Sequence, residues 1–110
     1  PSAIFTTPEA ASVGKSEDNL KDAGTEYVCR KGFYRSNGKA LAMDATDGMI
    51  KLFVTPEDGR ILGCHAYGAH SSDIIQEVAA LMNKDATVSE LADIIHTHPT
   101  LSEVLHDISL

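Results

Sequence analysis

The sequence has no segment suited to crossing a membrane and few residues suited to binding nucleic acid. No apolar run approaches the roughly 20 residues that a membrane-spanning helix needs, and no signal peptide is visible. Lys and Arg number 9 against 16 Asp and Glu residues, which gives a formal net charge of −7. This balance argues against nucleic acid and against an anionic membrane surface. We therefore expect no nucleic-acid partner and no membrane.

Cysteine is also scarce. Cys29 and Cys64 lie far apart in the sequence and form no C-x-x-C pair. They are typical of reduced core cysteines in a cytoplasmic protein, with a disulfide between them as the alternative. The G-x-G-x-x-G motif that marks a dinucleotide site does not occur either. The sequence therefore shows neither a redox-active cysteine pair nor a dinucleotide-binding loop.

The rest of the composition is that of a globular protein. A chain of 110 residues with 43% hydrophobic residues can bury a core of its own. We expect residues 1–110 to form a single domain. Because the chain begins with Pro1 and not with Met, we also expect it to be a piece of a longer protein.

Short stretches with an apolar period of two dominate the first two thirds of the chain. They predict strands over residues 3–7, 10–14, 26–34, 49–55 and 60–67. A Pro-Glu-Asp-Gly turn at 56–59 joins the last two strands into a hairpin. Ser16 is the predicted N-cap of a short helix that ends at Gly24. Residues 36–38 predict a turn, and residues 39–47 predict no definite structure.

Helical spacing replaces this alternation in the last third. One helix is expected after Ser71 or Ser72, and a Thr87–Glu90 capping box opens a second. Because strands come first and helices later, the predicted class is α+β, a mostly antiparallel sheet of about five strands with helices packed on it. The apolar faces comprise Ile74, Ile75, Val78, Ala79, Leu81 and Met82 in the first helix, and Val88, Leu91, Ala92 and Ile95 in the second.

Residues that could take part in acid–base chemistry are concentrated in the segment 96–103, which reads His-Thr-His-Pro-Thr-Leu-Ser-Glu. Thr100 and Glu103 fit a capping box, so a helix is predicted to start at Thr100. Glu103 would then hold one imidazole nitrogen of His98 and leave the other free, which is the arrangement of a histidine base. In the alternative interpretation, Glu103 only caps the helix and His98 is a loop histidine. The predicted apolar stripe of this helix is Leu101, Val104, Leu105 and Ile108.

Two interpretations without such a base compete with this one. The first is a free-standing zinc-binding module, because an extended segment would place His96 and His98 on one side. No spacing in the sequence matches a zinc signature. The second is a structural pairing module with no chemistry of its own. The candidate zinc ligands are His65, His70, His96, His98, His106 and Cys64.

Three stretches carry a resemblance that spans the chain. Residues 98–103, His-Pro-Thr-Leu-Ser-Glu, resemble the C-terminal signature of dihydrolipoamide dehydrogenases, within the flavin-dependent pyridine nucleotide–disulfide oxidoreductases. Residues 4–14 resemble the start of that family's C-terminal dimerisation domain, and residues 63–68, Gly-Cys-His-Ala-Tyr-Gly, resemble its middle. The resemblance implies the fold of that dimerisation domain.

The resemblance also implies a function. It makes His98 and Glu103 an acid–base pair that serves the active site of the partner subunit in a homodimer. The full-length enzyme would use FAD and NAD and act on dihydrolipoamide. Because the chain has neither a dinucleotide-binding glycine loop nor a paired disulfide, we expect the isolated chain to bind no flavin and to have no reductase activity. The resemblance favours a cis peptide bond between His98 and Pro99, as does the tight reversal that brings His98 to Glu103.

Overall fold

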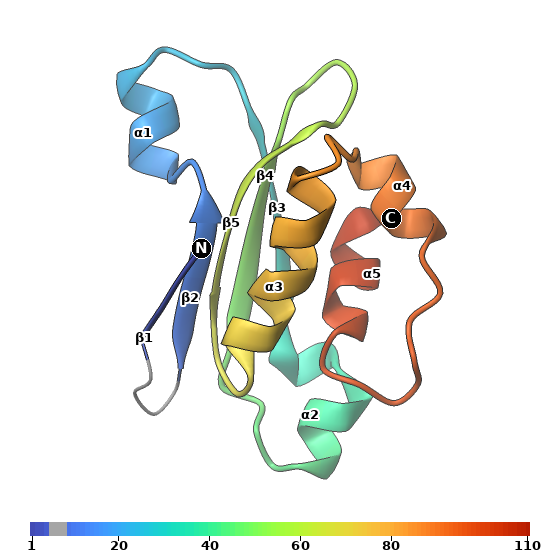
Figure 1. Cartoon of the computed structure of the whole chain (residues 1–110). Helices are drawn as coiled ribbons and strands as arrows, with labels where there is room; N and C mark the ends of the chain where they lie inside the picture. The colour runs from blue at the N-terminus through green and yellow to red at the C-terminus, as the bar shows by residue number, and fades with distance from the viewer. Residues whose placement is uncertain (5–8) are drawn as a thin grey trace.

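Five strands form one antiparallel sheet in the computed structural model, which describes residues 1–4 and 9–110 (Figure 1). The strand order is β1-β2-β5-β4-β3, so the β4–β5 hairpin lies near the middle of the sheet. This is the predicted α+β architecture. The strands are β1 (Ser2–Ile4), β2 (Ala10–Gly14), β3 (Val28–Phe33), β4 (Met49–Val54) and β5 (Ile61–Tyr67).

Helices α3, α4 and α5 lie on one side of the sheet (Figure 1). Helix α3 packs against β2 and β5, and α5 packs against β3 and β4. Helices α1 and α2 lie at opposite ends of the sheet in Figure 1. The helices are α1 (Glu17–Asp22), α2 (Gly38–Ala42), α3 (Ser71–Met82), α4 (Val88–Asp93) and α5 (Glu103–Ser109), with a 3-10 turn at Tyr34–Ser36.

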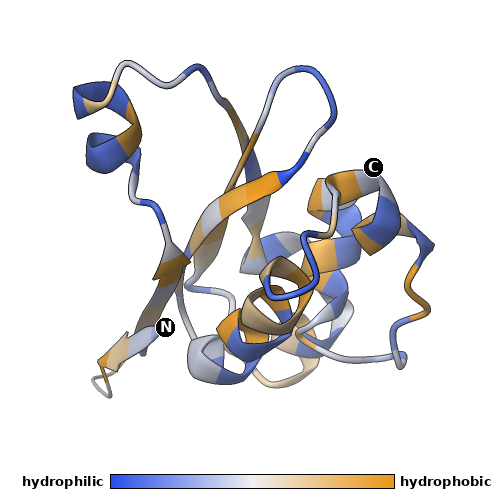
Figure 2. Cartoon of the chain, turned by 45° about the horizontal axis from the view of Figure 1, so that its top comes forward, coloured by the Kyte–Doolittle hydropathy of each residue, from blue (hydrophilic) through white to orange (hydrophobic). Residues whose placement is uncertain are grey.

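The core lies between the sheet and helices α3, α4 and α5. In the β4–β5 pair, Ile50 lies opposite Ala66 and Leu52 lies opposite Cys64, and all four side chains are buried. Every second side chain along a strand points to the same face of the sheet, so these four apolar residues share the face that packs against the helices. Figure 2 shows hydrophobic residues concentrated in the central strands and on the helices that pack on them.

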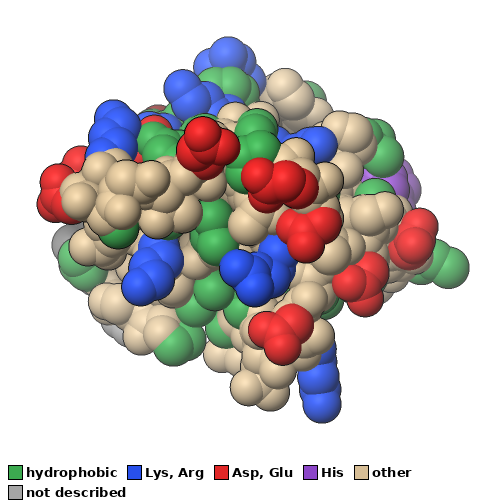
Figure 3. Space-filling view, turned by 90° about the horizontal axis from the view of Figure 1, so that it is seen from above, with side chains coloured by type: hydrophobic (Ala, Val, Ile, Leu, Met, Phe, Trp, Pro, Cys, Tyr) green, Lys and Arg blue, Asp and Glu red, His purple; other side chains and the backbone are tan. Residues whose placement is uncertain are grey.

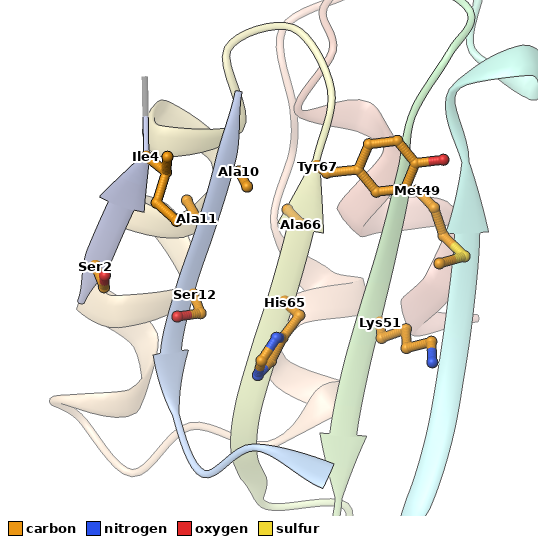
Figure 4. A pocket seen from close by; sticks show the side chains of 10 residues that line it. All are labelled: Ser2, Ile4, Ala10, Ala11, Ser12, Met49, Lys51, His65, Ala66 and Tyr67. Carbon is orange, nitrogen blue, oxygen red and sulfur yellow. The ribbon is translucent and has the colours of Figure 1, made fainter. Parts of the chain in front are cut away.

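The opposite face of the sheet is more polar and more open. Lys51 and His65 lie side by side there, because they are cross-strand partners in β4 and β5. Together with residues of β1 and β2 they line a shallow depression of about 370 Å³. Figure 4 shows this depression in front of the sheet, with the helices behind it.

Several predicted boundaries are confirmed. Ser16 caps α1 by accepting a hydrogen bond from the Asn19 amide, and Gly24 follows the helix with φ of 67°. The strand predicted over 3–7 begins in β1, while its residues 5–7 lie outside the described residues. The strand predicted over residues 26–34 forms, but β3 is shorter than the prediction and covers only Val28–Phe33. Both cysteines are free, so the disulfide alternative is wrong.

Other boundaries differ from the prediction because distant side chains decide them. Ser71 and Ser72 lie inside α3 and do not cap it; His70 precedes the helix with φ of 58°. The Glu9 carboxylate, far away in the sequence, accepts hydrogen bonds from the Ser72 amide at 3.1 Å and from its hydroxyl at 3.0 Å. Asn37, predicted to lie in a turn, caps α2 through the Ala40 amide at 2.9 Å.

The last two helices are shorter than predicted. Helix α4 ends at Asp93, so Ile95 does not belong to its apolar face and is 97% exposed. Helix α5 begins at Glu103 and not at Thr100. None of the helices in the described part of the chain has the length and apolar character that crossing a bilayer requires.

Candidate active site

An irregular segment, residues 94–102, connects α4 to α5 and contains the predicted site. It carries His96, His98 and Pro99, and the His98–Pro99 peptide bond is cis, as predicted. The side chain of His98 is 78% exposed, whereas that of His96 is only 7% exposed. The two histidines therefore do not lie on one side of the segment.

His98 contacts Glu103 as predicted. Its Nδ1 atom lies 2.9 Å from Oε1 and 3.0 Å from Oε2 of Glu103. A carboxylate can only accept, so Nδ1 carries the hydrogen and Nε2 of the neutral ring keeps its lone pair. An exposed imidazole with a fixed tautomer can take up a proton at Nε2.

The Glu103 carboxylate is itself held in place. The Thr100 amide donates to Oε1 at 2.9 Å, and this hydrogen bond, followed by the His98 contact, lowers the pKa of Glu103. Only this half of the predicted capping box forms, because the Thr100 hydroxyl donates to the Thr97 carbonyl at 2.7 Å. The Asn37 side chain donates to the Thr100 carbonyl at 3.0 Å. Glu103 is therefore ionised and oriented toward His98 near neutral pH.

A second histidine–glutamate pair lies beside the first and was not predicted. His96 Nε2 and Glu77 Oε2 are 2.6 Å apart, and Glu77 belongs to α3. The two residues are far apart in the sequence, and no local spacing links them. The one sequence feature that draws attention to His96 is its position two residues before His98. The zinc interpretation explains this spacing as two metal ligands on one side of the segment.

The zinc interpretation finds no support in this arrangement. Within residues 1–4 and 9–110, no group of three or more His, Cys, Asp or Glu residues could hold a metal ion. His65 lies on the open face of the sheet, and His70 pairs with Asp73 at 3.5 Å. His96 and His106 lie close together, but no third candidate ligand in the described part of the chain joins them.

The N-terminus of α3 does not fit the pyrophosphate of a flavin or nicotinamide dinucleotide. Free amides at a helix N-terminus are a common binding site for pyrophosphate. At α3, the longest described helix, the Ser72 amide already donates to the Glu9 carboxylate, which places a negative charge where the pyrophosphate would lie. The face of the molecule in Figure 3 interleaves basic and acidic side chains.

Comparison with known proteins decides the family. Residues 1–108 match the family described as pyridine nucleotide-disulphide oxidoreductase, dimerisation domain. The chain belongs to this family. The predicted resemblance is therefore confirmed at the level of the family and its fold.

Relatives of this dimerisation domain include dihydrolipoyl dehydrogenases. The enzyme of Geobacillus stearothermophilus is 41% identical over 104 residues, which cover 94% of this chain and 22% of the relative. That of Mycoplasma pneumoniae is 42% identical over 108 residues, which cover 98% of this chain and 24% of the relative. The chain thus spans about a quarter or less of the length of the curated relatives it matches.

Solved structures show the same fold. The HOCl-induced flavoprotein disulfide reductase RclA of Escherichia coli superimposes with a TM-score of 0.92 at 29% identity, over 98% of this chain and 25% of that one. LpdA of Mycobacterium tuberculosis superimposes with a TM-score of 0.91 at 24% identity, over 98% of this chain and 24% of that one. The dimerisation domain therefore has the fold expected for its family.

Proposed function

We propose that residues 1–110 form one unit, the dimerisation domain of a dihydrolipoamide dehydrogenase, and supply His98 and Glu103 to the active site of the partner subunit. The single observation that carries the proposal is the exposed His98 ring, fixed at Nδ1 by an ionised Glu103. The dihydrolipoyl dehydrogenases among the relatives support the choice of substrate.

His98 would act as the base for a dithiol substrate. A free thiol has a pKa of about 8.5, so only a few per cent is ionised at neutral pH, and only the thiolate attacks a disulfide. Nε2 of His98 takes the thiol proton, and the new thiolate attacks one sulfur of the protein disulfide. The S–S bond of the protein breaks, a mixed disulfide with the substrate forms, and the second protein sulfur leaves as a thiolate. Glu103 stabilises the imidazolium that forms, and the proton returns from Nε2 in the reverse direction.

The other parts of the reaction lie in the rest of the parent enzyme under this proposal. FAD, NAD and the redox-active disulfide belong there, because the N-terminus of α3 does not fit a pyrophosphate and both cysteines are free. The match to a dimerisation domain supports pairing of this chain with a second copy. We propose a symmetric homodimer, to be checked by sedimentation at micromolar concentration.

Mixed dimers of the full-length enzyme test the shared site. One subunit lacks the redox cysteines and keeps His98, and the other keeps the cysteines and carries His98→Gln. If His98 serves the opposite subunit, each mixed dimer contains one intact site and recovers activity that neither mutant homodimer has.

The contrary outcome is equally definite. If His98 serves its own subunit, no site in the mixed dimer is complete and mixing restores nothing. If His98→Gln homodimers retain full activity, the domain contributes pairing alone.

A further inference from the structure

The side chain of His96 is buried, although most residues of the segment 94–102 are not. Its side chain is 7% exposed, although Ile95 before it is 97% exposed and the His98 side chain is 78% exposed. Polar side chains are rarely buried to this extent unless they have a partner. The burial of His96 therefore points to a specific anchor two residues before His98.

Glu77 is that partner, and it belongs to a rigid part of the fold. The 2.6 Å distance between His96 Nε2 and Glu77 Oε2 is that of a strong hydrogen bond to a carboxylate. Ile74 and Val78, on the same helix, are buried against the sheet. The segment is thus fixed to α3 through His96, while His98 contacts α5 through Glu103.

A hollow lies beside His96, between α4 and α5. His96, His106, Glu103 and Asp93 are among the residues that line this depression of about 340 Å³. Nδ1 of His96 and Nδ1 of His106 are both buried without a hydrogen-bond partner among the described residues, and the two rings are 6.2 Å apart. The Glu77 contact at Nε2 is therefore the one hydrogen bond that the described residues give to the His96 ring.

We propose that His96 and Glu77 are positioning residues for His98. Glu77 holds His96 as the tautomer with hydrogen on Nε2, and the anchored backbone fixes the position of the His98 ring relative to α5. This inference rests on the proposed function of His98. A displacement of about 1 Å in a catalytic group can cost about 100-fold in rate, so an anchor this close matters.

Glu77→Gln in the full-length enzyme is the direct test, because glutamine keeps the shape but removes the charge that orients His96. We expect the dithiol half-reaction to slow about 10- to 100-fold with little change in the KM for the dithiol. The nicotinamide half-reaction should not change. Glu57→Gln, in the exposed turn between β4 and β5, is the matched control and should leave both half-reactions unaltered.

A double mutant shows whether Glu77 acts through His98. If it does, Glu77→Gln should cost nothing further once His98→Gln is present, since the group to be positioned is gone. An equal additional loss in that background would overturn the proposal, as would an unchanged dithiol half-reaction in Glu77→Gln. His96→Gln should reproduce the Glu77→Gln result.

Imidazole nitrogen NMR separates this inference from the proposed function. If His98→Gln leaves the dithiol half-reaction intact, the proposed function fails, and positioning is then read from the spectra alone. A shift of the His98 signals in Glu77→Gln, absent in Glu57→Gln, supports the anchor. Unchanged His98 signals overturn it.

Discussion

Gly32 lies where β3 passes closest to α5, and replacing it with alanine should force the two elements apart. A Cβ atom at this position would lie 2.3 Å from Cγ2 of Ile108, while its contacts with Val104 would be ordinary at 3.5 Å. The methyl groups must separate by about 1 Å to reach normal contact. Ile108 is β-branched and stiff at χ1, so the side chain cannot rotate away freely.

The expected cost follows from this overlap. Inserting a methyl group into a packed core destabilises by about 1–3 kcal/mol, and the lower chain entropy of alanine in the unfolded state offsets a part of it. We expect Gly32→Ala to lower the free energy of unfolding by about 1–2 kcal/mol. Gly38→Ala is the matched control. Gly38 is the first residue of α2, and a Cβ atom added there would have nothing within 4 Å, so alanine should stabilise by about 0.5–1 kcal/mol.

Urea unfolding of both variants at one fixed protein concentration measures the difference. A separation of roughly 2 kcal/mol, with a slope of about 1–3 kcal/mol per molar, moves the two midpoints apart by about 1 M. Gly32→Ala should have the lower midpoint. Equal midpoints, or a stabilised Gly32→Ala, would refute the close packing of α5 on β3.

Three further predictions concern thiols, a buried hydroxyl and a carboxylate. Burial raises the pKa of the Cys64 thiol to about 12 and raises that of Cys29 less strongly. Iodoacetamide at about pH 8 should therefore label Cys29 slowly and Cys64 only after unfolding. Mass spectrometry measures the labelling, and a labelled Cys64 in the native chain would contradict the prediction. Tyr34→Phe removes a hydroxyl that donates a hydrogen bond to the Ala69 carbonyl at 2.7 Å. The free energy of unfolding, measured with denaturant, should fall by about 1–3 kcal/mol. An unchanged midpoint would show that this hydrogen bond contributes nothing. The Thr100 amide and His98 lower the pKa of Glu103, so the ionised carboxylate contributes stability above about pH 4.5, its ordinary pKa, and this contribution is lost as the pH falls through the lowered value. Glu103→Gln should therefore be less stable than the original chain at about pH 6 and equal to it at about pH 2. A difference that persists in acid would contradict a contribution from the charged carboxylate.

Local patterns predicted the elements whose partners are near in the sequence. The alternation in β4 and β5 indicated the hairpin and its buried face, and Ser16 indicated the start of α1. The same locality explains the His98–Glu103 contact, since only residues 99–102 lie between the two. Short-range hydrogen bonds and periodic burial are encoded in such windows.

Distant contacts explain the failures. The Glu9 carboxylate takes the place of a serine cap at α3, and Glu77 is the hydrogen-bond partner of the buried His96 side chain. Each glutamate is remote in sequence from its partner. Ile95 continues the apolar spacing of α4, yet the helix ends at Asp93 and the chain turns toward Glu77. Sequence spacing alone does not contain these pairings, because tertiary contacts override local propensity.

Rapid-reaction kinetics of the full-length enzyme with His98→Gln test the role of His98 most directly. The two half-reactions are followed separately, one started with dithiol substrate and one with nicotinamide. A general base contributes about 10²- to 10⁴-fold, so the dithiol half-reaction should slow by that factor while the nicotinamide half-reaction stays near its original rate. Glu103→Gln should slow the dithiol step less. An unchanged dithiol half-reaction, or an equal loss in both half-reactions, would contradict the assignment of His98 as the base.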